Sequence, residues 1–211
     1  MYNPRVFAES ERETLLELID QYPFATLISH GSVEPTLSHL PLLLDRITPG
    51  GDELIGHMAR ANRHWQLFEA GAPLLVVFQG PHGYISPGWY ESAPSVPSWN
   101  YAVVHVVGSA RVVDSQETAS ILGRLVERFE SARPEPWRFD SLPADFVQDE
   151  LKAIVGFRIR IERLTGKFKL SQNKEPPDRD GALAGLEREG DAASRELAAF
   201  SRRYWARRQG R

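Results

Sequence analysis

The stretch 155–162 constrains the fold more than any other part of this sequence. Its apolar residues Val155, Phe157, Ile159 and Ile161 alternate with a glycine or with charged residues. A period of two predicts a strand that is apolar on one face and charged on the other. Strands of parallel sheets are usually apolar on both faces, whereas an antiparallel sheet can leave one face in water. The stretch therefore predicts an antiparallel sheet.

The rest of the chain supplies further strand patterns with helical patterns between them. Strands are predicted at 24–29, 33–44, 53–57, 73–79 and 99–113, and helices at 10–21, 62–70, 115–129, 143–153 and beyond 178. Glycines and prolines predict turns at 30–32 and 47–52, and an irregular, aromatic-rich segment at 80–101. This mainly-β pattern with inserted helices is typical of a barrel or an α+β fold. A dinucleotide-binding fold is excluded, because the chain lacks both a βαβα alternation and a GxGxxG run.

The composition narrows the function classes without choosing one. The net charge of −3 gives no general attraction to nucleic acid or membrane. The absence of cysteine excludes disulfides, thiolate nucleophiles and cysteine-bound metals. No window approaches the roughly 18 consecutive apolar residues of a membrane-spanning helix. Residues 1–20 lack the pattern of a signal peptide, so we expect a cytoplasmic protein that does not enter a membrane.

The domain organisation is predicted to be simple. We find no internal repeat and no low-complexity linker in the 211 residues. We predict one domain over residues 1–180, followed by a charged helical tail at 181–211 that packs on the barrel or extends from it. The tail contains the arginines Arg202, Arg203, Arg207, Arg208 and Arg211. These arginines could touch DNA phosphates, although an arginine-rich helix in solvent is the commoner meaning of such a run.

The run 54–65 combines a strand, a polar turn and a helix start. The strand is predicted to end at His57, and Asn62 is a favoured N-cap for the helix that follows. A helix N-terminus carries unpaired N–H groups that suit an anion, and Arg60 can add a charged fork for a phosphate. A solvated loop arginine beside a structural turn is the alternative interpretation. This run alone does not decide between the two.

Four stretches together resemble a known family. They are 57–65 (HMARANRHW), 80–90 (GPHGYISPGWY), 96–105 (VPSWNYAVVH) and 169–174 (KLSQNK). In that order they resemble the PaiB-type family, which is called the FMN-binding negative transcriptional regulators. That family is similar to the FMN-binding split barrels. The resemblance implies a six-stranded Greek-key barrel, a homodimer, and FMN in the cleft between the subunits.

The resemblance also implies roles for individual residues. Arg60, with the N–H groups around Ala61 and Asn62, would hold the FMN phosphate. Residues 38–41 and 55–57 would line the edge of the flavin. Trp99 and Asn100 would close the cleft from the other subunit, and Lys169 with 171–173 would complete it. The implied cofactor contacts are therefore Ser38, His39, Leu40, Pro41, His57, Arg60, Ala61, Asn62, Trp65, Trp99, Asn100, Lys169, Ser171, Gln172 and Asn173.

Other functions stay open at this stage. A flavin bound at a dimer cleft can accept hydride, so a flavin-dependent oxidoreductase or flavin reductase is an alternative, but no acid–base residue stands out and no catalytic residue is predicted. Haem bound by a histidine is a second alternative. We predict no metal site, because none of the six histidines shows the i, i+4 spacing of a helical zinc site. DNA binding is supported by no helix-turn-helix pattern or basic stripe, only by the family name.

Overall fold

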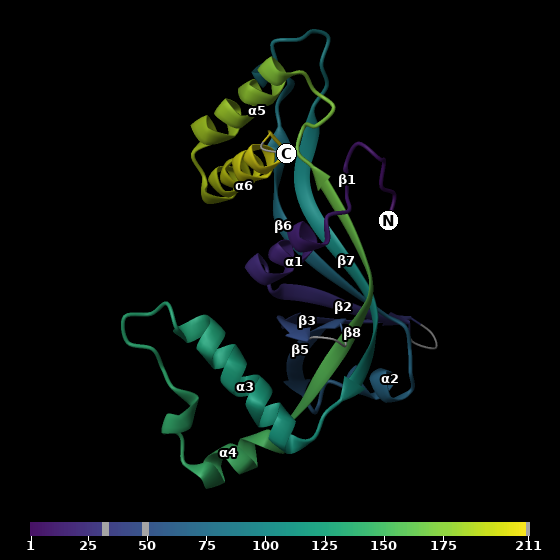
Figure 1. Ribbon diagram of the computed structural model, residues 1–211, viewed down its shortest axis with the longest axis vertical. Helices are drawn as coiled ribbons and strands as arrows, with labels where there is room; N and C mark the ends of the chain where they lie inside the picture. Colours follow the sequence, from purple (N-terminus) through teal and green to yellow (C-terminus); the bar gives the residue numbers. More distant parts are fainter. Residues whose placement is uncertain (31–33, 48–50, 210–211) are drawn as a thin grey trace. The chain divides into compact units, whose positions relative to one another are not determined.

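The strands form one hydrogen-bonded sheet (Figure 1). The computed structural model describes residues 1–30, 34–47 and 51–209, so parts of the predicted turns at 30–32 and 47–52, and Arg211, lie outside the described residues. The strand order is β3-β2-β6-β7-β8-β5-β4, with β1 beside β8. The strands are β1 Ala8–Glu9, β2 Phe24–His30, β3 Pro35–Pro41, β4 Leu43–Ile47, β5 Gly51–Ala59, β6 Leu74–Ile85, β7 Ser98–Val112 and β8 Ile154–Lys169.

The helices lie between these strands and after them. They are α1 Arg12–Gln21, α2 Trp65–Glu69, α3 Ser115–Glu130, α4 Ala144–Leu151, α5 Pro176–Glu189 and α6 Ala192–Gln209, with 3-10 helices η1 Pro87–Trp89 and η2 Phe139–Ser141. Within the described part of the chain, no helix is long and apolar enough to cross a membrane.

The predicted mainly-β class with inserted helices is confirmed, but the sheet has eight strands where the resemblance implies six. Two details explain the difference. The two-residue strand β1 pairs with β8. The strand predicted at 33–44 is divided at Leu42, because β3 pairs with β2 whereas β4 pairs with β5. The segment predicted as irregular at 80–101 is also corrected. Residues 80–85 continue β6, because sheet pairing outweighs the turn preference of their glycines and proline.

The chain divides into two compact units, each described by itself. Unit 1 comprises residues 1–18, 79–104 and 165–211, and unit 2 comprises residues 19–78 and 105–164. Strands β6, β7 and β8 contribute residues to both units.

Unit 2 has its core between strand side chains and α3. The alternation in β2 buries Ala25 and Leu27 on one face. The apolar stripe of α3 places Ile121 and Leu125 against Leu43 and Ile55. Arg158, on the charged face predicted for 155–162, is also covered: its guanidinium pairs with carboxylates that come from β4, β5 and α3, namely Asp45, Glu53 and Glu117.

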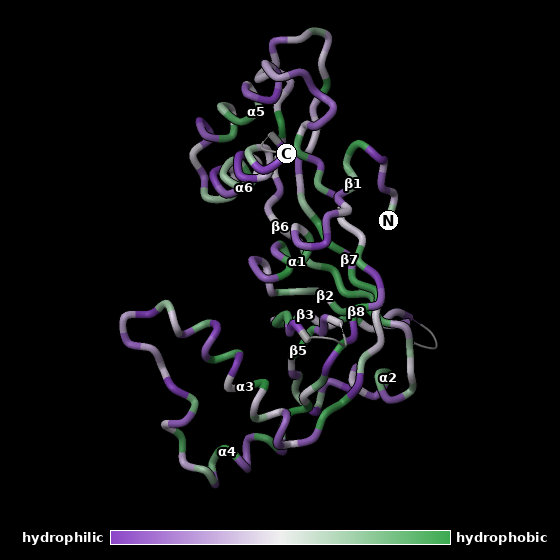
Figure 2. Tube along the Cα trace, viewed as in Figure 1, coloured by the Kyte–Doolittle hydropathy of each residue, from purple (hydrophilic) through white to green (hydrophobic). Residues whose placement is uncertain are grey.

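Unit 1 has its core under α1, α5 and α6. The ring of Phe168 lies 5.6 Å from the rings of Phe200 and Tyr204, measured between centroids, and all three side chains are buried. Leu186 of α5 and Leu197 of α6 are buried as well. Figure 2 shows hydrophobic and hydrophilic residues mixed along α5 and α6, as expected of helices that bury one side. The predicted boundary at 180 falls inside α5, and the division into a domain and a tail stays a prediction.

Candidate functional site

The turn after β5, in unit 2, does not begin a helix where the sequence predicts. Helix α2 starts at Trp65 with His64 as its N-cap residue, and no side chain caps it. The predicted start at Asn62 is wrong because residues 60–64 form a turn, in which the Asn62 side chain bonds both to a nearby backbone amide and to a distant side chain. Its Oδ1 accepts from the N–H of His64 at 3.1 Å, and its Nδ2 donates to Ser38 Oγ at 2.9 Å.

Three polar side chains meet here in what we call the Ser38 network: Ser38, Asn62 and His64. Ser38 Oγ lies 2.9 Å from His64 Nδ1, and these two residues are only 5% and 1% exposed. Burial lowers the pKa of His64, which favours the neutral imidazole. The Nε2 atom of His64 is buried and has no hydrogen-bond partner among the described residues. The network thus fixes one side of the imidazole and leaves the other side unsatisfied.

His57 shows the same feature on β5. It lies opposite Gly156 of β8, and its buried Nδ1 atom also has no hydrogen-bond partner. Burial lowers the pKa of His57. Buried polar atoms of native proteins are nearly always hydrogen-bonded, so two unpartnered imidazole nitrogens in one unit require an explanation. The polar edge of a bound ligand would provide one.

Arg60 is held by the backbone. Its Nε donates to the carbonyl of Lys152 at 2.8 Å and its Nη2 to the carbonyl of Ile154 at 2.9 Å. Trp65 Nε1 donates to the carbonyl of Arg60 at 3.1 Å. Part of the fork predicted for a phosphate therefore fastens the turn to the segment before β8. Ala61 lies exposed in the same turn.

The predicted contacts on β3 do not share a face. Successive side chains of a strand point to opposite faces. Ser38 and Leu40 lie on one face, and His39 and Pro41 on the other. His39 Nδ1 lies 3.0 Å from Thr26 Oγ1 on an exposed part of the sheet. Among these four residues, only Ser38 joins the network.

A second group of predicted residues lies in unit 1. Trp99 is 53% exposed, and its ring lies 6.4 Å from that of His82 and 6.3 Å from that of Tyr84. We call these three rings the Trp99 cluster. Asn100, the next residue, is buried and donates from Nδ2 to Ser171 Oγ at 2.9 Å. Ser171 adopts a left-handed conformation with φ of 65°, which is uncommon outside glycine.

Two lysines of β8, Lys167 and Lys169, form what we call the lysine pair. Lys169 Nζ donates to Ser98 Oγ. Lys167 is 8% exposed, donates to the carbonyl of Tyr2 at 3.0 Å and lies 5.5 Å from the centre of the Tyr101 ring. Burial is the main cause that lowers the pKa of Lys169, and the charge of Lys167 lowers it further. Within the described residues, no carboxylate forms an ion pair with either lysine.

The remaining predicted residues of unit 1 join neither the Trp99 cluster nor the lysine pair. Gln172 is used by the chain itself, because its Oε1 accepts from the N–H of Leu170 at 2.6 Å and its Nε2 donates to the carbonyl of Phe168. Asn173 is exposed. The structure thus groups Ser38, Asn62 and His64 in unit 2, and Trp99, Asn100 and Ser171 in unit 1.

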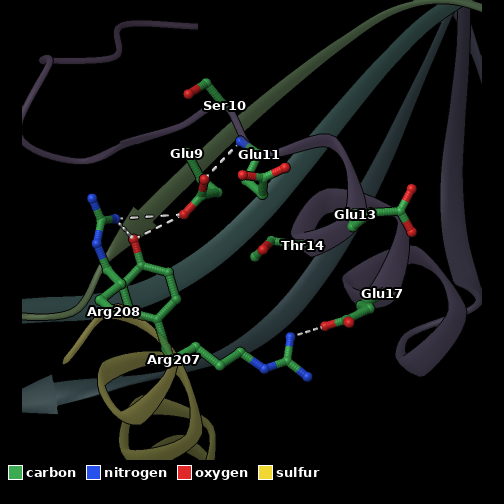
Figure 3. A pocket seen from close by; sticks show the side chains of 9 residues that line it. Glu9, Ser10, Glu11, Glu13, Thr14, Glu17, Arg207 and Arg208 are labelled. Carbon is green, nitrogen blue, oxygen red and sulfur yellow. Dashed lines mark hydrogen bonds and ion pairs between the residues drawn. The ribbon is translucent and has the colours of Figure 1, made fainter. Parts of the chain in front are cut away.

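A cleft of about 580 Å³ in unit 1 contains none of the predicted cofactor contacts (Figure 3). There the Tyr204 hydroxyl donates to Glu9 Oε2 at 2.9 Å, and Arg208 lies beside both. Arg207 pairs with Glu17. Arg202 pairs elsewhere in unit 1, with Glu187 at 2.8 Å, so three of the arginines that could contact DNA are engaged in ion pairs.

Sequence reasoning assigned no role to four residues that the structure places in these groups: His64, Lys167, His82 and Tyr84. His64 lies inside the run 57–65 but was not chosen, because a lone histidine carries no signal of its hydrogen-bond partner. Lys167 is two residues before Lys169, and the period of two of a strand could have placed both on one face.

Comparison with known proteins identifies the family to which the chain belongs. Residues 1–163 match the family described as "Putative FMN-binding domain". The chain is 35% identical over 198 residues to the "Protease synthase and sporulation protein PAI 2" of Bacillus subtilis, covering 94% of this chain and 95% of that protein. It is 31% identical over 238 residues to an uncharacterized protein of Emericella nidulans, with the same coverage of 94% and 95%. The resemblance to the PaiB-type family is confirmed.

Solved structures share the fold. The FAD and heme binding protein from Mycobacterium smegmatis superimposes with a TM-score of 0.61 at 22% identity, over 83% of this chain and 79% of that one. The flavocytochrome Anf3 from Azotobacter vinelandii gives a TM-score of 0.60 at 20% identity, over 77% and 69%. These likenesses agree with the split-barrel class.

Proposed function

Because the chain belongs to the family of FMN-binding domains matched by residues 1–163, we propose that it binds a flavin, and specifically FMN. That match is the observation that carries the proposal. FMN combines a planar apolar ring, a polar ring edge and a phosphate, so its site needs aromatic or apolar surface, hydrogen-bonding groups and cations. When bound, it supplies redox chemistry.

The residues of this chain fit such a ligand. In unit 2, the unpartnered nitrogens of His57 and His64 are hydrogen-bonding groups without a protein partner. In unit 1, the exposed ring of Trp99 offers a stacking surface, and Lys169 lacks a carboxylate partner within the described residues. Each unit thus offers candidate flavin contacts of its own. In unit 2 we propose His57, Ser38, Asn62 and His64 for polar groups of a flavin, and in unit 1 we propose Trp99 for a ring and Lys169 for a phosphate.

Titration of FMN and riboflavin into the purified protein tests the proposal. Flavin fluorescence should be quenched as FMN binds, with saturation at micromolar concentration or below. Riboflavin has the same ring without the phosphate, and we expect it to bind more weakly. Lys169→Met should narrow the difference between the two ligands. A protein that quenches neither flavin and shows no flavin absorption after incubation with FMN would contradict the proposal.

We also propose that the chain works as a homodimer. One face of the sheet in unit 2 carries apolar side chains that are open to solvent: Leu37 is 54% exposed, and its pairing partner Ile28 and the next partner Leu75 are half-buried on the same face. A second copy would cover this face and remove apolar surface from water.

Light scattering checks the dimer directly. We expect twice the chain mass of 23.8 kDa at micromolar concentration. Leu37→Glu should shift the mass toward that of one chain, because a charge would be buried in the interface. Arg63→Glu, which places a negative charge at an exposed position outside this face, is the matched control. A wild-type protein with the mass of one chain would overturn the homodimer.

We propose that a regulatory role, as the family name implies, acts through the flavin. The terminal arginines give little support to direct DNA contact, since Arg202, Arg207 and Arg208 are engaged with glutamates of unit 1.

A further inference from the structure

The segment between β6 and β7 is held in place by α5. This segment contains η1 and leads to Ser98, the first residue of β7, which directly precedes Trp99. The indole of Trp89 lies on α5 where the helix has glycines. A Cβ atom on Gly185 would come within 2.1 Å of Trp89 Cδ2, and one on Gly181 within 2.0 Å of the Trp89 carbonyl oxygen. Any side chain larger than that of glycine at position 181 or 185 would therefore clash with Trp89.

A buried carboxylate fixes the same segment. Asp178, in the first turn of α5, is 3% exposed. Its Oδ1 accepts from the N–H groups of Glu91 and Ser92 at 2.9 and 3.0 Å, and its Oδ2 accepts from Ser92 Oγ at 2.5 Å. Charge-assisted hydrogen bonds of this kind are stronger than neutral ones. One side chain thus holds two consecutive backbone amides and a hydroxyl.

These contacts lead to the predicted flavin contacts. Tyr90 is the residue before the two anchored amides, and the N–H of Lys174 donates to the carbonyl of Ser171 at 3.0 Å. The Nζ atom of Lys174 lies 4.3 Å from the centre of the Tyr90 ring. Ser171 Oγ also accepts from Asn100 Nδ2. Lys174 therefore links the Tyr90 ring to Ser171, the left-handed residue to which Asn100 is bonded.

We propose that Asp178 is a positioning residue of the flavin site: it anchors the backbone at Glu91 and Ser92, and this anchor places the Tyr90 ring against Lys174. Lys174 holds the Ser171 carbonyl, and Ser171 then orients Asn100. The inference rests on the proposed function, because Asn100 and Ser171 are flavin contacts only if flavin binds. It adds a residue beyond the segment 1–163 that matches the family. This chain of contacts would make α5 part of the binding site.

Three substitutions on α5 test the proposal. Asp178→Ala removes all three hydrogen bonds, and Asp178→Asn keeps an oxygen for the two amides. Asp180→Ala, an exposed acid two residues later on the same helix, is the matched control. Gly185→Ala disturbs the segment independently, by displacing Trp89. Each variant is titrated with FMN, its bound-flavin absorption spectrum is recorded, and amide hydrogen exchange is followed at residues 91 and 92.

We expect Asp178→Ala to weaken FMN about tenfold, to change the absorption spectrum of the bound flavin, and to speed exchange at residues 91 and 92. Asp178→Asn should recover much of both the affinity and the spectrum. Asp180→Ala should match the wild type. Gly185→Ala keeps the proposal testable if Asp178→Ala fails to fold, and should also weaken FMN.

Two results would overturn the inference in different ways. Faster exchange at residues 91 and 92 with unchanged FMN affinity and spectrum would show that Asp178 is only structural, while the proposed function stands. A wild-type protein that binds no FMN would overturn the proposed function, and the inference with it.

Discussion

The Ser38 network of unit 2 and the Trp99 cluster of unit 1 hold predicted flavin contacts under opposite conditions. Ser38 and His64 are almost fully buried and bonded to each other, so their geometry is set before any ligand arrives. Trp99 is 53% exposed, and the nearby Lys169 has no carboxylate partner within the described residues. The comparison indicates that unit 2 would offer a ligand polar groups whose positions are already fixed. The exposed ring of unit 1 would be ordered only when a ligand or a partner packs against it.

We expect Ser38→Val to produce the largest difference in stability between the two regions. This change leaves Asn62 Nδ2 and His64 Nδ1 without their partner, so the free energy of unfolding should fall by about 2–3 kcal/mol. Trp99→Ala, at the exposed site, should cost about 1 kcal/mol or less yet weaken FMN. Chemical denaturation of both variants, beside FMN titration, measures this. Equal losses of stability would remove the contrast.

Arg60 gives an intermediate effect and tests whether its role is purely structural. Arg60→Ala removes two charge-assisted bonds to the carbonyls of Lys152 and Ile154 at an exposed position, which should cost about 1–2 kcal/mol of stability. If Arg60 also holds the phosphate, FMN should weaken more than riboflavin. Arg63→Ala is the exposed control and should change neither quantity. Equal weakening of FMN and riboflavin would mean that Arg60 holds only the turn.

The smallest effect is a pH dependence that belongs to unit 2. Burial lowers the pKa of His57 and His64 from the ordinary value of 6.5, so the unfolded chain takes up protons that the folded chain resists. Their contribution to stability is complete above pH 6.5 and is lost as the pH falls toward their folded values. His64→Gln should reduce this loss in denaturation curves between pH 7 and 5. Wild-type stability that is constant over this range would contradict the assignment.

How much the sequence could predict differs between these regions for physical reasons. The strands were predictable because the period of two at 155–162 is a local property of the chain. The start of α2 was not, since Asn62 is a good N-cap by itself and only the three-dimensional fold brings Ser38 within reach of its side chain. The backbone bonds of Arg60 were not predictable for the same reason: a sequence carries no sign of the carbonyls at Lys152 and Ile154 that the guanidinium meets.

Asp178 is a second case in which the sequence does not reveal the partners of a side chain. Asp178 reads as an ordinary acidic residue in the first turn of a helix, which is where acids are common. Its partners Glu91 and Ser92 come 87 and 86 residues earlier in the chain. Motif reading found Asn100 and Ser171 because the family pattern includes them, but it could not find what orients them.

The hydrogen bond between Glu9 and Tyr204 has a consequence for how the protein is made. The two residues are 195 positions apart. At a synthesis rate of about 5–20 residues per second, Glu9 emerges roughly 10–40 seconds before its partner exists. Unit 1 joins three separate stretches of the chain, so it is complete only after the last stretch, 165–211, has been synthesised. Unit 1 is therefore the later of the two units to be completed, and a chaperone can bind it during this interval.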